Sequence, residues 1–201
     1  KFDGIIVVAL FGEGLIPDLE EALALGMKIV VLNQVVGPAL DTADPQVDGF
    51  SASVLAPPLR SGERMGELVV QACADKDPCN VVYFYGIRGI PLDIALRDGF
   101  DAVTGANPAI IVVAEGEGLY LGPDQGIAQM QDILVATPDF DVVVGADQPI
   151  QGVEIVLSDA GLLEGVALIG LGGSTHALAA ISSGTWFAGV MGAPATDRKS
   201  T

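Results

Sequence analysis

The amino-acid sequence predicts an α/β fold made of two doubly wound parallel sheets with helices on their faces. Short apolar runs rich in Val and Ile recur without polar alternation, which is typical of strands that are buried on both faces. Amphipathic segments with helical spacing lie between most of these runs, and repeated strand–helix units indicate a mostly parallel sheet. One long connection lacks helical spacing, which favours two open sheets over a closed (β/α)₈ barrel.

Strands are predicted where an apolar run is short and is bounded by turn-forming residues. In chain order, the predicted strands cover residues 4–10, 28–33, 49–54, 80–85, 109–114, 141–145, 166–170 and 186–191. The predicted helices cover residues 14–25, 60–74, 91–103, 123–136, 148–163 and 174–183. Pro17, Pro91 and Pro123 fall in the first turns of their helices, where proline is tolerated, and Gly26 suits the end of the first helix.

The connection formed by residues 34–48 decides between the two architectures. It contains glycine and two prolines and has no helical period, although a barrel would have a helix there. The chain is therefore expected to cross between two sheets near residues 54–58 and again near residues 189–194. The predicted domains are a partial N-terminal lobe, residues 1–55 and 190–201, and a C-terminal lobe, residues 56–189.

The charge balance is strongly acidic. Nine Lys and Arg residues stand against 26 Asp and Glu residues, which gives a formal net charge of −17 and a pI near 4.1. Such a chain repels phosphate backbones and anionic lipids, so nucleic acid is not an expected partner, and the charge also favours solubility. The mean hydropathy is +0.52, yet no apolar run reaches about 18 residues, so no membrane span is predicted.

Two cysteines, Cys73 and Cys79, flank a short turn between a predicted helix and a predicted strand. The spacing suits a disulfide that closes a short loop, and two unpaired thiols are the alternative. A disulfide would place the protein outside a reducing cytosol. The sequence has a single histidine, so a zinc site built from Cys and His lacks ligands, and no metal is expected.

Candidate ligand-binding residues follow the predicted strands, because ligands of open parallel sheets lie outside the carboxyl ends of the strands. These residues are Phe11, Asn33, Gln34, Arg88 and Asp147. Most of them also have a plainer interpretation. Asn33 and Gln34 could belong to a solvated loop, Arg88 could pair with a surface carboxylate, and Asp147 could cap the helix that follows it.

Two glycine-containing loops add further candidates. Gly172 lies in the segment of residues 170–175 between a strand and a helix, where backbone amides could hold an anion or a ligand hydroxyl. This segment is a poor dinucleotide-binding fingerprint, because Thr175 stands at the position of the third glycine. Tyr120 lies in an acidic loop, where it could stack on a ligand ring or cover a helix start.

No arrangement of residues indicates catalysis. No nucleophile is paired with a base, and Gly173-Ser174 lacks the pattern around a nucleophilic serine. His176 suits a solvated position in the first turn of a helix, whereas Trp186 and Phe187 suit the core. The chain is therefore expected to bind a ligand without chemistry and without a cofactor.

Several short motifs occur in a fixed order along nearly the whole chain. They are Asp3-Gly-Ile-Ile-Val-Val8, Lys28-Ile-Val-Val-Leu-Asn33, Tyr85-Gly86, Arg97-Asp-Gly-Phe100, Thr137-Pro-Asp139, Val142-Val-Val-Gly-Ala-Asp147 and Ile169-Gly-Leu-Gly172. Their order and spacing resemble type I periplasmic binding proteins, in particular the ribose-like sugar-binding class of ABC transporters. The fold of this family is shared with lac-repressor-type effector domains.

The resemblance implies two Rossmann-like lobes with the ligand in the cleft between them, and a first lobe that is incomplete in this chain. Asn33 and Gln34 stand where the family has an aspartate and an arginine, and Arg97 resembles the arginine of its cleft. Asp147 matches the aspartate at a strand end. Gly172 stands where an aspartate is common.

Tyr120 falls beside the aromatic residue that stacks on the ligand in the family. Several groups that read sugar hydroxyls are nevertheless absent, and a buried hydroxyl without a partner costs about 1–3 kcal/mol. The resulting hypothesis is a ligand that is larger or less polar than a simple pentose or hexose.

The predicted function is the extracytoplasmic solute-binding component of an ABC importer, which closes about a hinge on a small sugar-like or less polar ligand. Its expected partner is a membrane permease, and its expected location is the periplasm or another extracytoplasmic space, with or without a lipid anchor. One alternative is the effector-binding domain of a lac-repressor-type transcription regulator, which unpaired thiols would favour. The other alternative is a (β/α)₈ enzyme.

Overall fold

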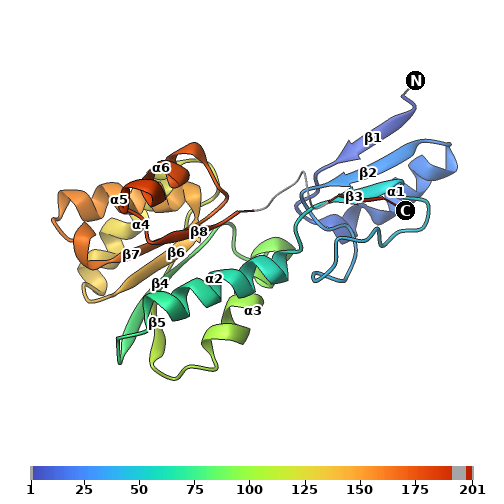
Figure 1. Cartoon of the computed structure of the whole chain (residues 1–201). Helices are drawn as coiled ribbons and strands as arrows, with labels where there is room; N and C mark the ends of the chain where they lie inside the picture. Colours follow the sequence, from blue (N-terminus) through green and yellow to red (C-terminus); the bar gives the residue numbers. More distant parts are fainter. Residues whose placement is uncertain (1, 192–197, 201) are drawn as a thin grey trace.

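The computed structural model describes residues 2–191 and 198–200, and the side chains of residues 2–191. Its strands form two separate sheets, which confirms the predicted α/β class and contradicts a closed barrel. Figure 1 shows the two sheets apart, with the chain between β3 (Ala52–Val54) and α2 (Pro58–Ala72) passing from one to the other.

The smaller sheet contains three parallel strands and one antiparallel strand. In spatial order it consists of β1 (Gly4–Val7), β2 (Lys28–Leu32), β3 and β9 (Arg198–Ser200). The last strand, β9, pairs antiparallel with β3. The 3₁₀ turn η1 (Gly12–Leu15) and helix α1 (Ile16–Ala24) connect β1 to β2, whereas residues 33–51 connect β2 to β3 without a helix, as predicted.

One face of the smaller sheet forms a core with α1 and with the connection of residues 33–51. Val7 and Ile29 point into this core, where Leu19 and Phe50 are also buried. On the opposite face, Ile6 is 71% exposed. Apolar side chains on both faces are typical of parallel strands in a doubly wound sheet.

The larger sheet is entirely parallel, with the strand order β5-β4-β6-β7-β8. Its strands are β4 (Cys79–Tyr85), β5 (Ile110–Glu117), β6 (Val142–Ala146), β7 (Ala167–Leu171) and β8 (Ala188–Val190). The helices are α2, α3 (Pro91–Thr104), α4 (Pro123–Ala136), α5 (Asp147–Asp159) and α6 (Thr175–Ser183), with a 3₁₀ turn η2 (Leu163–Gly165) before β7. Helices α2 and α3 cover one face, and α4, α5 and α6 cover the other (Figure 1).

Successive residues of the central strands point to opposite cores. Val81 and Tyr83 of β4 pack with α2 and α3, whereas Val82 and Phe84 pack with α4, α5 and α6. Because both faces are covered by helices, neither set of residues can be polar. This is why the apolar runs in the sequence show no alternation.

The predicted elements are found with shifted ends. The first strand ends at Val7 rather than at residue 10, and the last strand begins at Ala188 rather than at residue 186. Trp186 is buried as predicted, but the core prediction for Phe187 is wrong. Phe187 is 46% exposed because it precedes β8, which is an edge strand of the described sheet. β9 is missing from the predicted strands because its residues are polar.

The lobe boundaries remain a prediction, and the second predicted crossing near residues 189–194 lies partly outside the described residues, at 192–194. Among the described helices, none combines the length and the apolar character that crossing a membrane requires.

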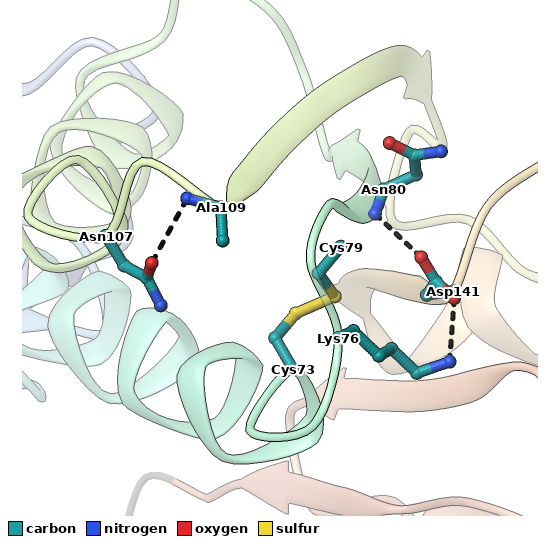
Figure 2. Close-up of a disulfide and its surroundings, with 7 residues drawn as sticks. All are labelled: Cys73, Lys76, Cys79, Asn80, Asn107, Ala109 and Asp141. Carbon is teal, nitrogen blue, oxygen red and sulfur yellow. Dashed lines mark hydrogen bonds and ion pairs between the residues drawn. A yellow bond between two sulfur atoms is a disulfide. The ribbon is translucent and has the colours of Figure 1, made fainter.

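The predicted disulfide is present. The sulfurs of Cys73 and Cys79 are 2.05 Å apart, and both residues are buried (Figure 2). Cys73 follows the last residue of α2, and Cys79 begins β4. Lys76 lies in the enclosed loop and donates from Nζ to Asp141 Oδ1 at 2.7 Å, and just after the loop the backbone N–H of Asn80 donates to Asp141 Oδ2 at 2.8 Å. The loop is therefore held both covalently and by an ion pair to the start of the neighbouring strand β6.

We expect the double substitution Cys73→Ala and Cys79→Ala to lower the free energy of unfolding by about 2 kcal/mol. The unfolded chain would regain the freedom that is lost in a closed loop of sequence separation 6. Urea denaturation with and without a thiol reductant measures the effect in the wild type. The reductant should lower the free energy of unfolding of the wild type only, and an equal decrease in the double variant would contradict the expectation.

Helices α2 and α3 approach so closely that two positions require glycine. A Cβ atom on Gly62 would overlap the carbonyl group of Leu96, and a Cβ atom on Gly99 would overlap the carbonyl group of Leu59. Backbone atoms cannot rotate away as a flexible side chain can, so the helices would have to separate.

The substitution Gly99→Ala should therefore lower the free energy of unfolding by about 1–3 kcal/mol. At Gly165 an added Cβ would meet nothing within 4 Å. The matched control Gly165→Ala should change the same quantity by less than about 0.5 kcal/mol. Chemical denaturation measures both, and equal effects of the two substitutions would show that the close approach is not what requires Gly99.

Candidate functional site

A crevice lies between the two sheets, at the carboxyl ends of their strands. It is lined by Ala9, Leu10, Asn33, Gln34, Val35 and Leu40 from the region around the smaller sheet, and by Pro58, Pro91 and Leu92 from the starts of α2 and α3. Its volume of about 10 Å³ is room for about one water molecule. Only one edge of a sugar-sized ligand could therefore enter this crevice, unless its walls move apart.

Asn33 and Gln34 are the polar side chains of the crevice. Asn33 has a left-handed backbone with φ of 65°, a conformation that asparagine tolerates better than most residues, and its N–H donates to Val54 O at 2.9 Å. Gln34 is only 8% exposed. Among the described residues, neither side-chain amide has a hydrogen-bond partner, so both amides are available to bond to a ligand.

The predicted site residues Arg88 and Arg97 do not line the crevice and belong to a cluster of charges beside the edge strand β5. Arg97 donates to Glu115, to Asp101 at 2.8 Å and to the Tyr85 hydroxyl at 2.8 Å. Arg88 donates to Glu115 at 2.9 Å, and its guanidinium lies 4.1 Å from the centre of the Tyr85 ring. The plainer interpretation of Arg88, an ion pair with a surface carboxylate, matches this geometry.

The cluster changes the acidity of Glu115. Burial alone would raise the pKa of Glu115, but hydrogen bonds from Arg97 and Arg88 outweigh burial and lower that pKa below its ordinary value of 4.5. Glu117, the last residue of β5, accepts a hydrogen bond from the backbone N–H of Arg88 at 3.0 Å. Arg88 thus joins the loop after β4 to β5, and Arg97 joins α3 to the ends of β4 and β5.

Tyr120 is anchored by a carboxylate that the sequence did not reveal as a candidate. Its hydroxyl donates to Asp93, 3.1 Å from each carboxylate oxygen, and its ring covers Gly86 so closely that a Cβ there would overlap it. Asp93 also accepts from the backbone N–H groups of Gly86 at 2.6 Å and Ile87 at 3.0 Å. This carboxylate ties the loop after β4 to the loop after β5.

Burial raises the pKa of Asp93 above its ordinary value, although the two backbone N–H groups and Tyr120 act in the opposite direction. Burial, followed by the charge of Asp93, also raises the pKa of Tyr120. The available signal for Asp93 was its place as the third residue of a helix that begins at Pro91. An acidic side chain there can reach back to N–H groups that precede the helix.

Asp147 is the first residue of α5 and is only 1% exposed. The interpretation of Asp147 as the helix cap is wrong, because Ala146 occupies the capping position. Its Oδ2 atom accepts from the backbone N–H of Ser174 at 2.6 Å, and its Oδ1 atom has no partner among the described residues. A Cβ on Gly172 would lie 2.9 Å from Oδ2. The glycine therefore leaves room for a carboxylate that fixes the loop after β7.

Phe11 is 61% exposed after β1 but does not line the crevice. His176 is half exposed, as expected for a helix start, and its Nε2 atom lies 2.7 Å from Glu154 Oε2. The same oxygen accepts from Trp186 Nε1 at 2.7 Å. In the described part of the chain, no group of three His, Cys, Asp or Glu residues could hold a metal. Of the predicted ligand-binding residues, the structure brings only Asn33 and Gln34 together in the crevice.

Residues 1–197 match the family model described as periplasmic binding protein domain. No curated protein matches the sequence. Among solved structures, a periplasmic solute-binding protein of an ABC transporter from Actinobacillus succinogenes 130z, with bound D-allose, is 22% identical with a TM-score of 0.79. The alignment includes 92% of this chain and 64% of the Actinobacillus protein.

Two further structures are similar. The Caulobacter myo-inositol binding protein is 22% identical with a TM-score of 0.83, and 98% of this chain covers 64% of it. The binding component of the arabinose ABC transporter from Shewanella sp. ANA-3, bound to L-arabinofuranose, is 20% identical with a TM-score of 0.84, and 96% of this chain covers 63% of it. At these identities the likeness establishes the fold, and the chain spans less than two thirds of each relative.

The ion pairs of Glu115 make the free energy of unfolding depend on pH in the acidic range. A carboxylate whose pKa is lowered by folding contributes stability above its ordinary value of 4.5, and this stability is lost as the pH falls through the lower, folded value. Thermal denaturation between about pH 6 and pH 3 should show this loss, and Glu115→Gln should make it shallower. The control Glu20→Gln, at an exposed residue of α1, should leave the acid dependence as in the wild type. An unchanged profile for Glu115→Gln would contradict this assignment.

Proposed function

Because the chain belongs to the periplasmic binding protein domain family, we propose that it acts as the extracytoplasmic solute-binding component of an ABC importer. The ligand is a small sugar-like molecule that is held between the two lobes. The observation that carries this proposal is the crevice at the carboxyl ends of both sheets, where the uncommitted amides of Asn33 and Gln34 face residues of the other lobe.

The arrangement of the two sheets supports binding by closure. The chain between β3 and α2 joins two separately packed bodies, and such a connection can absorb a change in the angle between them. The structural relatives hold D-allose, myo-inositol and L-arabinofuranose according to their descriptions. We carry over to this chain a ligand of that size, with a membrane permease as the partner that receives it.

The ionisable groups at the strand ends support binding rather than catalysis. Asp93 and Asp147 are buried and bonded to backbone N–H groups, and Arg88 and Arg97 are paired with Glu115. A general acid or base must reach a reacting atom, and Asp93, Arg88 and Arg97 would each have to break its own contacts to do so. Asp147 keeps one oxygen without a partner among the described residues, but that oxygen is fully buried.

The disulfide between Cys73 and Cys79 supports a location in an oxidising compartment such as the periplasm, with or without a lipid anchor. It weighs against a cytosolic transcription regulator, whose thiols would be kept reduced. The net charge of −17 also supports partners other than nucleic acid.

Calorimetric titration with neutral monosaccharides and inositols tests the proposed function. We expect at least one of them to bind with a dissociation constant in the micromolar range or below, and to raise the midpoint of thermal unfolding by mass action. Small-angle scattering should show a more compact molecule when that ligand is bound. If no member of the panel binds, or if the bound ligand is chemically converted, the proposed function is wrong.

The substitution Gln34→Ala should weaken this binding about tenfold, because the ligand loses a hydrogen-bonding partner in the crevice. Gln131→Ala, at an exposed position of α4, is the matched control and should leave the affinity unchanged. Equal affinities of the two variants would place the ligand away from the crevice.

A further inference from the structure

The crevice contains polar groups without containing charge. Asn33 and Gln34 are its only side chains that can form hydrogen bonds, and each amide offers two donors and an acceptor. Gln34 is more than nine-tenths buried and, among the described residues, unpartnered. The amide atoms of Gln34 still reach solvent, and Asn33 is exposed, so both amides can bond to a ligand oxygen that accepts and donates, such as a hydroxyl group.

Among the described residues, none that lines the crevice is charged, and most charged groups at this end of the larger sheet are bonded within the protein, Asp147 Oδ1 being the exception. Asp93 accepts from two backbone N–H groups and from Tyr120, and Asp147 accepts from Ser174. Arg88 and Arg97 share the carboxylate of Glu115. An ionised ligand in the crevice would lose its water without gaining a counter-charge.

The remaining walls of the crevice are apolar. They consist of Ala9, Leu10, Val35, Leu40, Pro58, Pro91 and Leu92. Leu10 is still 49% exposed, and its neighbour Phe11 is 61% exposed, so a ligand could cover apolar surface here. Hydroxyl groups that faced these residues would lose hydrogen bonds to water and gain none.

On the basis of the proposed function, we propose that the site between the lobes selects an uncharged ligand with one polar and one apolar edge. The amides of Asn33 and Gln34 bind hydroxyl or ether oxygens of the polar edge. Leu10, Pro91 and Leu92 pack against the apolar edge. The substrate class is therefore a partly deoxygenated or alkylated sugar, such as a deoxyhexose or an alkyl glycoside, rather than a fully hydroxylated hexose or an ionised sugar.

A panel of chemically matched probes tests this selectivity by calorimetric titration. For each of several hexose stereoisomers it contains the parent hexose, the 6-deoxyhexose, the methyl glycoside, the hexuronate and the 2-amino sugar. The tightest probe should be a deoxyhexose or a methyl glycoside, at least about tenfold tighter than its parent hexose and its ionised counterparts. Its affinity should change less than about twofold between about 0.05 and 0.5 M NaCl, because no ion pair is formed.

The outcomes separate this proposal from the proposed function. If an ionised probe or a fully hydroxylated hexose binds tightest, the selectivity is wrong although the protein still binds a sugar. If no probe of any kind binds, the proposed function itself fails, and the selectivity fails with it.

Two variants test the two edges separately. Gln34→Glu places a charge in the crevice and should lower the affinity for the neutral probe at least about tenfold. Gln131→Glu adds the same charge at an exposed site of α4 and should change that affinity by less than about twofold. Leu10→Asn should reduce the preference for the deoxygenated probe over its parent hexose. If Gln34→Glu fails to fold, the Leu10→Asn comparison decides: an unchanged preference would overturn the apolar edge.

Discussion

Burial of parallel strands on both faces is the constraint on which the rest of this structure depends. Every residue of β6 is buried, and β4 is buried along almost its whole length. Helices occupy both faces of this sheet, so no ligand can approach the strands from above or below. Polar groups can gather only in the loops that follow the strands, and the position of the candidate site follows from this constraint.

Those loops are not stiff by themselves, and two buried carboxylates hold them. Asp93 joins the loops after β4 and β5 through Gly86 and Tyr120, and Asp147 joins the start of α5 to the loop after β7 through Ser174. A carboxylate that accepts backbone N–H groups forms strong, directional bonds. The same bonds occupy both oxygens of Asp93 and one oxygen of Asp147, and neither acid lines the crevice, whose polar side chains are neutral amides.

The sequence predicted the order of strands and helices because that order depends on local apolar patterns. It predicted the disulfide because Cys73 and Cys79 flank a turn that brings a helix end beside a strand start. It also predicted that Asn33 and Gln34 follow a strand, whereas their role in ligand binding stays a prediction. It could not show which strand-end residues point at one another, because that depends on contacts between distant segments.

Asp93 illustrates that limit. In the sequence it is one acid among many in a helix start, and its role appears only when Gly86 and Tyr120 are placed beside it. Arg97 illustrates the same limit: the motif resemblance predicts a place in the cleft, and this role stays a prediction, but it could not show that Glu115, Asp101 and Tyr85 engage the guanidinium. Contacts of this kind join residues on different elements, and no local pattern reports them.

The charge of the whole chain and the charge of the crevice act together on ligand choice. With 26 acidic and nine basic residues, the protein carries a negative potential that repels anions before they reach the site. Salt screens this potential over about 8 Å at physiological ionic strength, so it weakens anion approach without abolishing it. The neutral crevice adds a second, short-range penalty that applies to either sign, because an ion there loses water and gains no counter-charge. If the proposed site is correct, anions are opposed at both ranges and cations only at short range, so among ionised sugars a cationic one should compete more strongly with the proposed neutral ligand.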